Sequence, residues 1–117
     1  MATGTIKTLG WKLLWTNPDP NSAFPVTGTI SLDLSNYSEV AVIVRNVSDG
    51  GSHYRCYVGL VGYELMPLGM SLNKIMYREF TISESGVSST SAGIYNSYGG
   101  SPTNDGKYNI PVYIYAR

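Results

Sequence analysis

Glycine and proline interrupt this chain so often that no amphipathic helix of ordinary length fits between them. The 117 residues include 13 glycines and 6 prolines, and β-branched and aromatic residues fill the intervals. Proline removes a backbone donor and restricts the residue before it, while glycine weakens a helix interior. The sequence therefore predicts an all-β protein made of short strands.

Most of these intervals alternate as strands do. In residues 27–34, Ile30, Leu32 and Leu34 share one face and polar side chains share the other, which indicates a half-buried antiparallel strand. Residues 39–45 are apolar on both faces, as in a central strand covered on two sides. Further strands are expected over residues 11–16, 54–60, 63–66, 74–83, 87–95 and 108–115, with a polar loop over 96–106.

About seven or eight strands without a crossover helix predict an antiparallel, jelly-roll-like β-sandwich. The length fits a single domain over residues 1–117, with residues 1–8 as a flexible N-terminal arm. Arg78 interrupts an otherwise apolar face of the strand over 74–83. We therefore expect Arg78 near the end of a strand or paired with a carboxylate.

Low charge is the second constraint on this chain. Charged residues make up 14% of it, against about 25% in an average soluble protein, and eight acidic residues balance eight basic ones. This balance leaves no electrostatic footprint for nucleic acid or for an anionic membrane. The apolar runs are too short to span a bilayer, and the N-terminus lacks the regions of a signal peptide. We expect neither nucleic-acid binding nor membrane insertion.

Residues suited to catalysis are sparse. His53 is the only histidine and Cys56 the only cysteine, which leaves no serine-hydrolase motif and no thiolate zinc site. His53 is interpreted as a loop or strand-end residue and Cys56 as a small buried hydrophobe. We expect no catalytic residue, no metal ligand and no cofactor. The alternatives are a small carbohydrate-active or cell-wall-directed enzyme domain and a carbohydrate-binding module of a larger enzyme.

The abundance of aromatic, hydroxyl and amide side chains favours weak binding of a polar ligand over catalysis. A sugar ring can lie on an aromatic face while polar side chains bond its hydroxyls. The competing interpretation is structural, because strand tyrosines usually pack and an Asn-Asp-Gly segment usually forms a turn. The candidate residues for glycan contact form two patches, the first of Tyr95, Asn96, Tyr98, Asn104 and Asp105, and the second of Asp49, His53 and Arg55.

Strands that are apolar on both faces indicate another kind of contact. Tyr113 and Tyr115 lie opposite the core-facing residues of the last strand, and Leu14 and Ile43 likewise point away from their core-facing neighbours. A sandwich of this size has a single core, so a loop or a second subunit must cover these side chains. We expect a homo-oligomer with these four residues in its interface.

The two ends of the chain resemble those of small β domains in virion proteins. The segments LGWKLLWTNP (9–18) and ISLDLSNY (30–37), with Ala23-Phe24 between them, are similar to the start of such modules. The polar turn TNDG (103–106) and the strand IPVYIY (110–115) are similar to their close. These modules occur in tail-fibre, head-fibre and minor structural proteins of phages and prophages that infect Gram-positive bacteria.

The resemblance implies a jelly-roll-like module, commonly trimeric, that serves fibre structure or host attachment. It implies assembly in the host cytoplasm, location in the virion, contacts with other virion proteins and binding to host-surface polysaccharide. It identifies no site residue. Because no coiled-coil heptads follow Met1, we expect a free-standing decoration or fibre-tip protein, or an excised domain.

Overall fold

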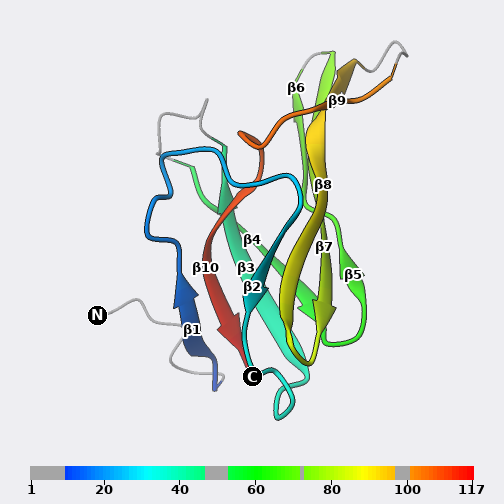
Figure 1. Cartoon of the computed structure of the whole chain (residues 1–117). Coiled ribbons are helices and arrows are strands. Elements are labelled where there is room, and N and C mark those ends of the chain that lie inside the picture. Colours follow the sequence, from blue (N-terminus) through cyan, green and yellow to red (C-terminus); the bar gives the residue numbers. More distant parts are fainter. Residues whose placement is uncertain (1–9, 47–52, 72, 97–100) are drawn as a thin grey trace.

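The computed structural model of the chain describes residues 10–46, 53–71, 73–96 and 101–117. These residues form strands, turns and irregular segments without a helix, which confirms the all-β prediction (Figure 1). Accordingly, the described ranges hold no helix long and apolar enough to cross a membrane. The expected N-terminal arm, residues 1–8, lies outside the described residues.

The described residues contain ten strands, more than the seven or eight that the sequence predicts. Two of them, β6 and β9, fall in segments expected to be loops, because strands of two to four residues leave no periodic signal. They form where the two longest strands offer free backbone groups. The strands are β1 (Lys12–Thr16), β2 (Gly28–Ser31), β3 (Glu39–Arg45), β4 (Arg55–Leu60), β5 (Glu64–Leu65), β6 (Leu68–Ser71), β7 (Lys74–Ser83), β8 (Gly86–Asn96), β9 (Thr103–Asn104) and β10 (Ile110–Ala116).

The strands form two antiparallel sheets that pack face to face as a β-sandwich. The first sheet has the order β1-β10-β3-β4, and the second has the order β2-β8-β7-β5. The first strand therefore pairs with the last, and β2 pairs with β8. This nesting of the two ends of the chain is in keeping with the expected jelly-roll-like sandwich.

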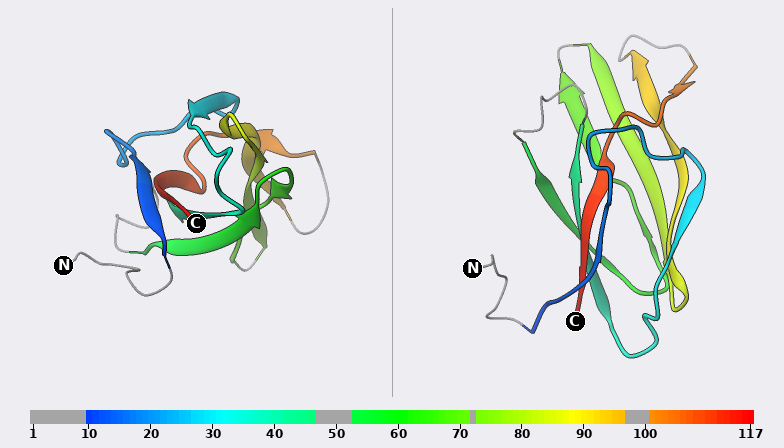
Figure 2. Two further views of the ribbon diagram at one scale, coloured as in Figure 1. Left: turned by 90° about the horizontal axis from the view of Figure 1, so that it is seen from below. Right: turned by 60° about the vertical axis from the view of Figure 1, so that its left-hand side comes forward.

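The second sheet is longer than the first because β7 and β8 change partners along their length. β7 pairs with β5 in its lower half and with β6 in its upper half, and β8 pairs likewise with β2 and then β9. The upper ends of β6 to β9 extend beyond the first sheet in both side views (Figures 1 and 2). We call this part, made of β6, residues 74–77, residues 93–96 and β9, the distal sheet.

The core fills the space between the two sheets and stops below the distal sheet. Alternate residues of β3, β7, β8 and β10 point into it, and half-buried Trp15 and Phe24 pack against its margin with their ring centroids 6.2 Å apart. The buried members of the core are Ile30, Leu34, Val40, Val42, Val44, Phe80, Ile82, Val87, Ile114 and Ala116.

A β-bulge in β1 reverses one expectation from the sequence. Leu13 pairs with Tyr115 and Trp15 pairs with Ile114, so Leu14 is an extra residue in β1. As a result both Leu14 and Trp15 pack against the core. The expectation that Leu14 points away from the core is therefore wrong, and Leu13 takes the outward position with 48% of its surface exposed.

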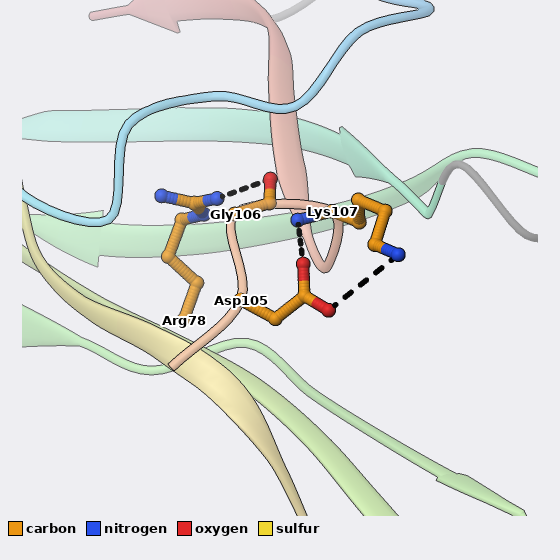
Figure 3. Close-up of polar contacts among 4 residues, drawn as sticks. All are labelled: Arg78, Asp105, Gly106 and Lys107. Carbon is orange, nitrogen blue, oxygen red and sulfur yellow. Dashed lines mark hydrogen bonds and ion pairs between the residues drawn. The ribbon is translucent and has the colours of Figure 1, made fainter. Parts of the chain in front are cut away.

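Arg78 closes the upper end of the core. Its side chain is fully buried and lies on the same face of β7 as Phe80, two residues along the strand. At this level the irregular segments 20–27 and 105–109 cross the sandwich. Such segments cannot pair their carbonyl groups in a ladder, so a buried donor has to serve them. The guanidinium group donates hydrogen bonds of 2.6–3.2 Å to Ser89 Oγ and to the carbonyl oxygens of Phe24, Pro25, Gly106, Tyr108 and Asn109. Figure 3 shows the bond to Gly106.

The expectation that Arg78 lies near a strand end or meets a carboxylate is wrong. Among the described residues its hydrogen-bond partners are carbonyl groups and a hydroxyl, and its Cζ lies 5.4 Å from the centre of the Phe24 ring. Burial lowers the pKa of Arg78 to about 10, so the guanidinium stays protonated at neutral pH. Arg78 therefore links the two crossing segments to the second sheet and fixes the base of the distal sheet.

Candidate functional site

The outer face of the distal sheet brings aromatic and apolar side chains together. Residues directly opposite each other in antiparallel strands point to the same face. The pairing therefore places Tyr77 and Tyr95 on one face, with a half-buried isoleucine and two exposed apolar side chains beside them. The rows across this face are Met70, Ile75 and Tyr95, and then Leu68, Tyr77, Gly93 and Asn104.

The two tyrosines form the centre of this face. Their ring centroids are 6.1 Å apart and the rings are inclined at 61°. A Cβ atom on Gly93 would lie 3.2 Å from Tyr77 Oη and only 2.2 Å from the Thr103 carbonyl oxygen. Glycine at position 93 thus allows β9 to approach β8 and Tyr77 to lie over the backbone. Leu68 and Met70 border the pair with 48% and 75% of their surfaces exposed.

Below the tyrosines, the same face of the second sheet is lined by small hydroxyl side chains. Thr29 Oγ1 and Ser88 Oγ are 3.0 Å apart, and Ser83 Oγ and Ser85 Oγ are also 3.0 Å apart. Thr90 donates to a carboxylate oxygen of Glu79 at 3.1 Å. The hydroxyl residues on or beside this face are Thr29, Ser31, Thr81, Ser83, Ser85, Ser88, Thr90 and Ser91.

The structure brings together two residues of the first predicted glycan patch. Tyr95 and Asn104 lie on the same outer face, joined through Gly93 and β9. Asp105 is engaged in the turn itself, because its carboxylate accepts the Lys107 backbone N–H at 3.0 Å and lies 3.7 Å from Lys107 Nζ (Figure 3). Tyr98 and the side chain of Asn96 lie outside the described residues.

The second predicted patch does not join this face. His53 and Arg55 are exposed at the start of β4, in the first sheet. Arg55 Nη1 would lie 3.5 Å from a Cβ atom on Gly69, which belongs to the inward-facing row of β6 with Met76. Asp49 lies outside the described residues. Tyr95 and Arg55 therefore lie on opposite sides of the distal sheet.

Sequence reasoning missed Tyr77 as a partner of Tyr95. Alternation in residues 74–83 sets Tyr77 on the face opposite Arg78 and Phe80, and both of these side chains are buried. The missing information was the register, which sets Ile75 against Tyr95 and Tyr77 against Gly93. A hairpin of β7 and β8 closing near residues 84–85 is the sequence signal from which that register follows.

The outer face of the first sheet is apolar and contains three of the four predicted interface residues. Its two central rows are Leu13, Tyr115, Ala41 and Val58, and then Thr16, Tyr113, Ile43 and Cys56. Tyr113 and Tyr115 are half-buried, with ring centroids 6.5 Å apart. Cys56 is exposed on this face, so the interpretation of Cys56 as a buried hydrophobe is wrong. Partial burial nevertheless raises the pKa of its thiol.

Several acidic side chains in the described ranges engage in separate local contacts. Asp33 accepts hydrogen bonds from the Ser35 hydroxyl at 2.6 Å and the Ser35 backbone N–H at 3.1 Å, and these bonds lower the pKa of Asp33. Glu39 forms an ion pair with Arg117 at 2.7 Å. No group of three or more metal-ligating side chains occurs among the residues that the structure describes.

Comparisons with known proteins place the chain in no established group. No protein-family model matches it, no curated protein matches it, and no solved structure matches it.

Proposed function

We propose that the protein is a non-enzymatic structural module of a phage virion, a decoration or fibre-tip protein that contacts host-surface glycans through the outer face of the distal sheet. The observation that carries the proposal is the pair Tyr77 and Tyr95, at 6.1 Å, on a face that continues into a field of hydroxyl side chains. The resemblance of the chain ends to phage fibre modules supports the virion context.

The chemistry of this face suits a neutral or weakly charged sugar. The apolar side of a pyranose ring packs on an aromatic ring, and hydroxyl and amide groups exchange hydrogen bonds with the sugar hydroxyls. Tyr77 and Tyr95 provide the aromatic surface, Asn104 provides an amide at its edge, and Thr90 and Ser91 provide hydroxyls next to it. Side chains of this kind bond water and sugar with similar strength, so the expected binding is weak and gains from several copies on one virion.

Three of the described carboxylates have separate local partners, which supports a binding role over hydrolysis. A glycosidase uses two carboxyl groups that flank one bond. Glu79 bonds Thr90 on the second sheet, Glu39 pairs with Arg117 on the first, and Asp33 bonds Ser35 in a turn. These three acids belong to different parts of the fold, so none of them forms a pair around a common substrate position.

The proposal is tested by probing the purified protein on an array of bacterial surface polysaccharides, followed by calorimetry on the best binder. Tyr95→Ala and Tyr77→Ala should each weaken binding at least tenfold, equivalent to about 1.4 kcal/mol, since each removes part of the aromatic surface. Tyr63→Ala is the matched control, because Tyr63 is 65% exposed in the turn after β4, away from this face.

Two results would overturn the proposal. One is an absence of binding across the array by the full chain at high protein density. The other is equal loss of binding in Tyr63→Ala and Tyr95→Ala, since binding would then depend on general aromatic exposure. The virion context is checked separately by mass spectrometry of purified particles, in which peptides of this chain should appear with capsid and tail proteins.

A further inference from the structure

We infer that copies of this chain pack on one another through the outer face of the first sheet. This inference does not depend on glycan binding, because it concerns the opposite side of the sandwich and is tested without a sugar. We call the surface the assembly face and define it as Leu13, Ala41, Ile43, Cys56, Val58, Leu60, Tyr113 and Tyr115.

The exposure of the assembly face is the first argument. Leu13 at one edge is 48% exposed, and Val58 and Leu60 at the other edge are each 49% exposed. In the same rows the outer residues of the central strand β3, Ala41 and Ile43, are 1% exposed and half-buried, respectively. Apolar side chains thus run across all four strands, which is the pattern of one half of a packed pair of sheets.

Charge favours a second copy of this chain as the occupant. Neither central row contains a charged residue, so two identical faces meet without like-charge repulsion. The charges at the lower border are already neutralised within one chain. Glu39 Oε1 accepts from Arg117 Nε at 2.7 Å, and the Arg117 guanidinium lies 4.5 Å from the centre of the Trp11 ring. A charged partner would find no complementary group in the centre of this surface.

Shape also suits packing of identical faces. Small Ala41 lies between Tyr115 on β10 and Val58 on β4, and the ring of Tyr113 lies next to Ile43. Side chains of two sheets interdigitate when large and small residues alternate across the faces. Because Ala41 is only 1% exposed, the surface that a second copy meets is formed by the larger side chains around it, Tyr113, Tyr115 and Val58.

The size of the assembly face sets the strength of the association. Four strands about 4.8 Å apart, over seven residues of about 3.3 Å each, cover about 440 Å² of flat area. A standard interface buries about 800 Å² per partner. The association is therefore expected to be reversible and to depend on protein concentration in the micromolar range.

Cys56 supplies a direct reporter, because it is the only cysteine of the chain and lies on the assembly face. We expect the rate of maleimide labelling of the native protein to fall at least fivefold as its concentration rises from about 1 to about 100 μM at constant reagent. Light scattering over the same range should show the mass rising from that of one chain to that of a dimer, because two identical faces that pack on each other leave no free copy of the face.

Two matched variants locate the surface. Val58→Lys puts a charge in the central row of the assembly face and should give a monomer whose labelling rate is independent of concentration. Met70→Lys makes the same change at a side chain that is 75% exposed on the distal sheet, and it should behave as the native protein does. Circular dichroism confirms that both variants fold.

Each other outcome contradicts the inference. A native monomer at all concentrations overturns it, whether Cys56 labels quickly or is protected by another part of its own chain. An oligomer that survives Val58→Lys, or that is lost in Met70→Lys, overturns the assignment of the surface. Failure of glycan binding leaves these measurements unchanged, so the two proposals fail separately.

Discussion

Replacement of Arg78 by methionine tests the interaction on which the junction between core and distal sheet depends. Methionine has a similar length and no charge, so it removes the hydrogen bonds while keeping most of the buried volume. The carbonyl oxygens of Phe24, Pro25, Tyr108 and Asn109 then lose the donor that Arg78 supplies. The fifth carbonyl, that of Gly106, still accepts the Phe24 N–H at 2.9 Å. We expect a large loss of stability with the sheets of the sandwich preserved.

The magnitude follows from two opposing terms. A buried carbonyl left without a donor costs about 1–3 kcal/mol, so four of them cost about 4–12 kcal/mol. The variant no longer has to desolvate a buried charge, and this offsets part of the loss. Burial lowers the pKa of Arg78 from 12.5 to about 10, which corresponds to about 3 kcal/mol. The two terms leave about 1–9 kcal/mol. Water that replaces some of the lost bonds removes the upper part of this range, so we expect a net loss in free energy of unfolding of about 3–5 kcal/mol. A domain of this size has about 6–18 kcal/mol in total.

The assay is urea unfolding followed by tryptophan fluorescence, which is sensitive here because Trp15 packs against Phe24, a partner of Arg78. Arg78→Lys should lie between the native protein and Arg78→Met, since lysine keeps the charge but lacks the planar fork of donors. Arg55→Met is the matched control at an exposed arginine and should change stability by less than about 0.5 kcal/mol. A loss below about 1 kcal/mol in Arg78→Met would refute the reasoning, because the carbonyl groups would then be satisfied without Arg78.

Two further predictions concern the edge of the distal sheet and a turn. Gly93→Ala should lower the free energy of unfolding by about 1–3 kcal/mol, because its Cβ would lie 2.2 Å from the Thr103 carbonyl oxygen; faster amide exchange confined to β9 is the local readout, and unchanged exchange there would contradict the close approach. Ser35→Ala should raise the pKa of Asp33 toward 3.8, since the Ser35 hydroxyl is the main cause of its lowering; a carboxyl NMR titration measures it. The Asp33 bonds stabilise the fold above about pH 3.8 and are lost as pH falls through the lowered pKa, a dependence that should weaken in the variant.

The two outer faces of the sandwich carry different kinds of side chain. The first sheet exposes aliphatic and tyrosine side chains without charge in its central rows, whereas the second exposes tyrosines, hydroxyls, an amide and the Glu79 carboxylate. An ordinary monomer fills such positions with lysine and glutamate. The proposed assembly through one face and the proposed contact with a neutral polymer through the other would both be favoured by few charges.

The sequence predicts more of the fold than of the candidate site. The strand over residues 74–83 and the central strand over 39–45 were predictable to the residue, because both alternate or run apolar between clear breaks. The sequence predicted Tyr95 and Asn104 together as candidate contact residues, but Tyr77 was not joined to them. Their proximity depends on the pairing of β8 with β7 and β9, which periodicity within one strand does not contain.

By itself, the sequence determined that this protein is a β-sandwich with little charge on its surface, because glycine and proline spacing, two-residue alternation and composition are all local properties. Only the tertiary structure decided three other points. The bulge in β1 turned Leu14 inward and Leu13 outward, the crossing segments gave Arg78 carbonyl partners up to 54 positions away, and the exchange of partners along β7 and β8 created the distal sheet. Each of these depends on which backbone groups remain unpaired after the strands have packed, and that is known only when the sheets meet.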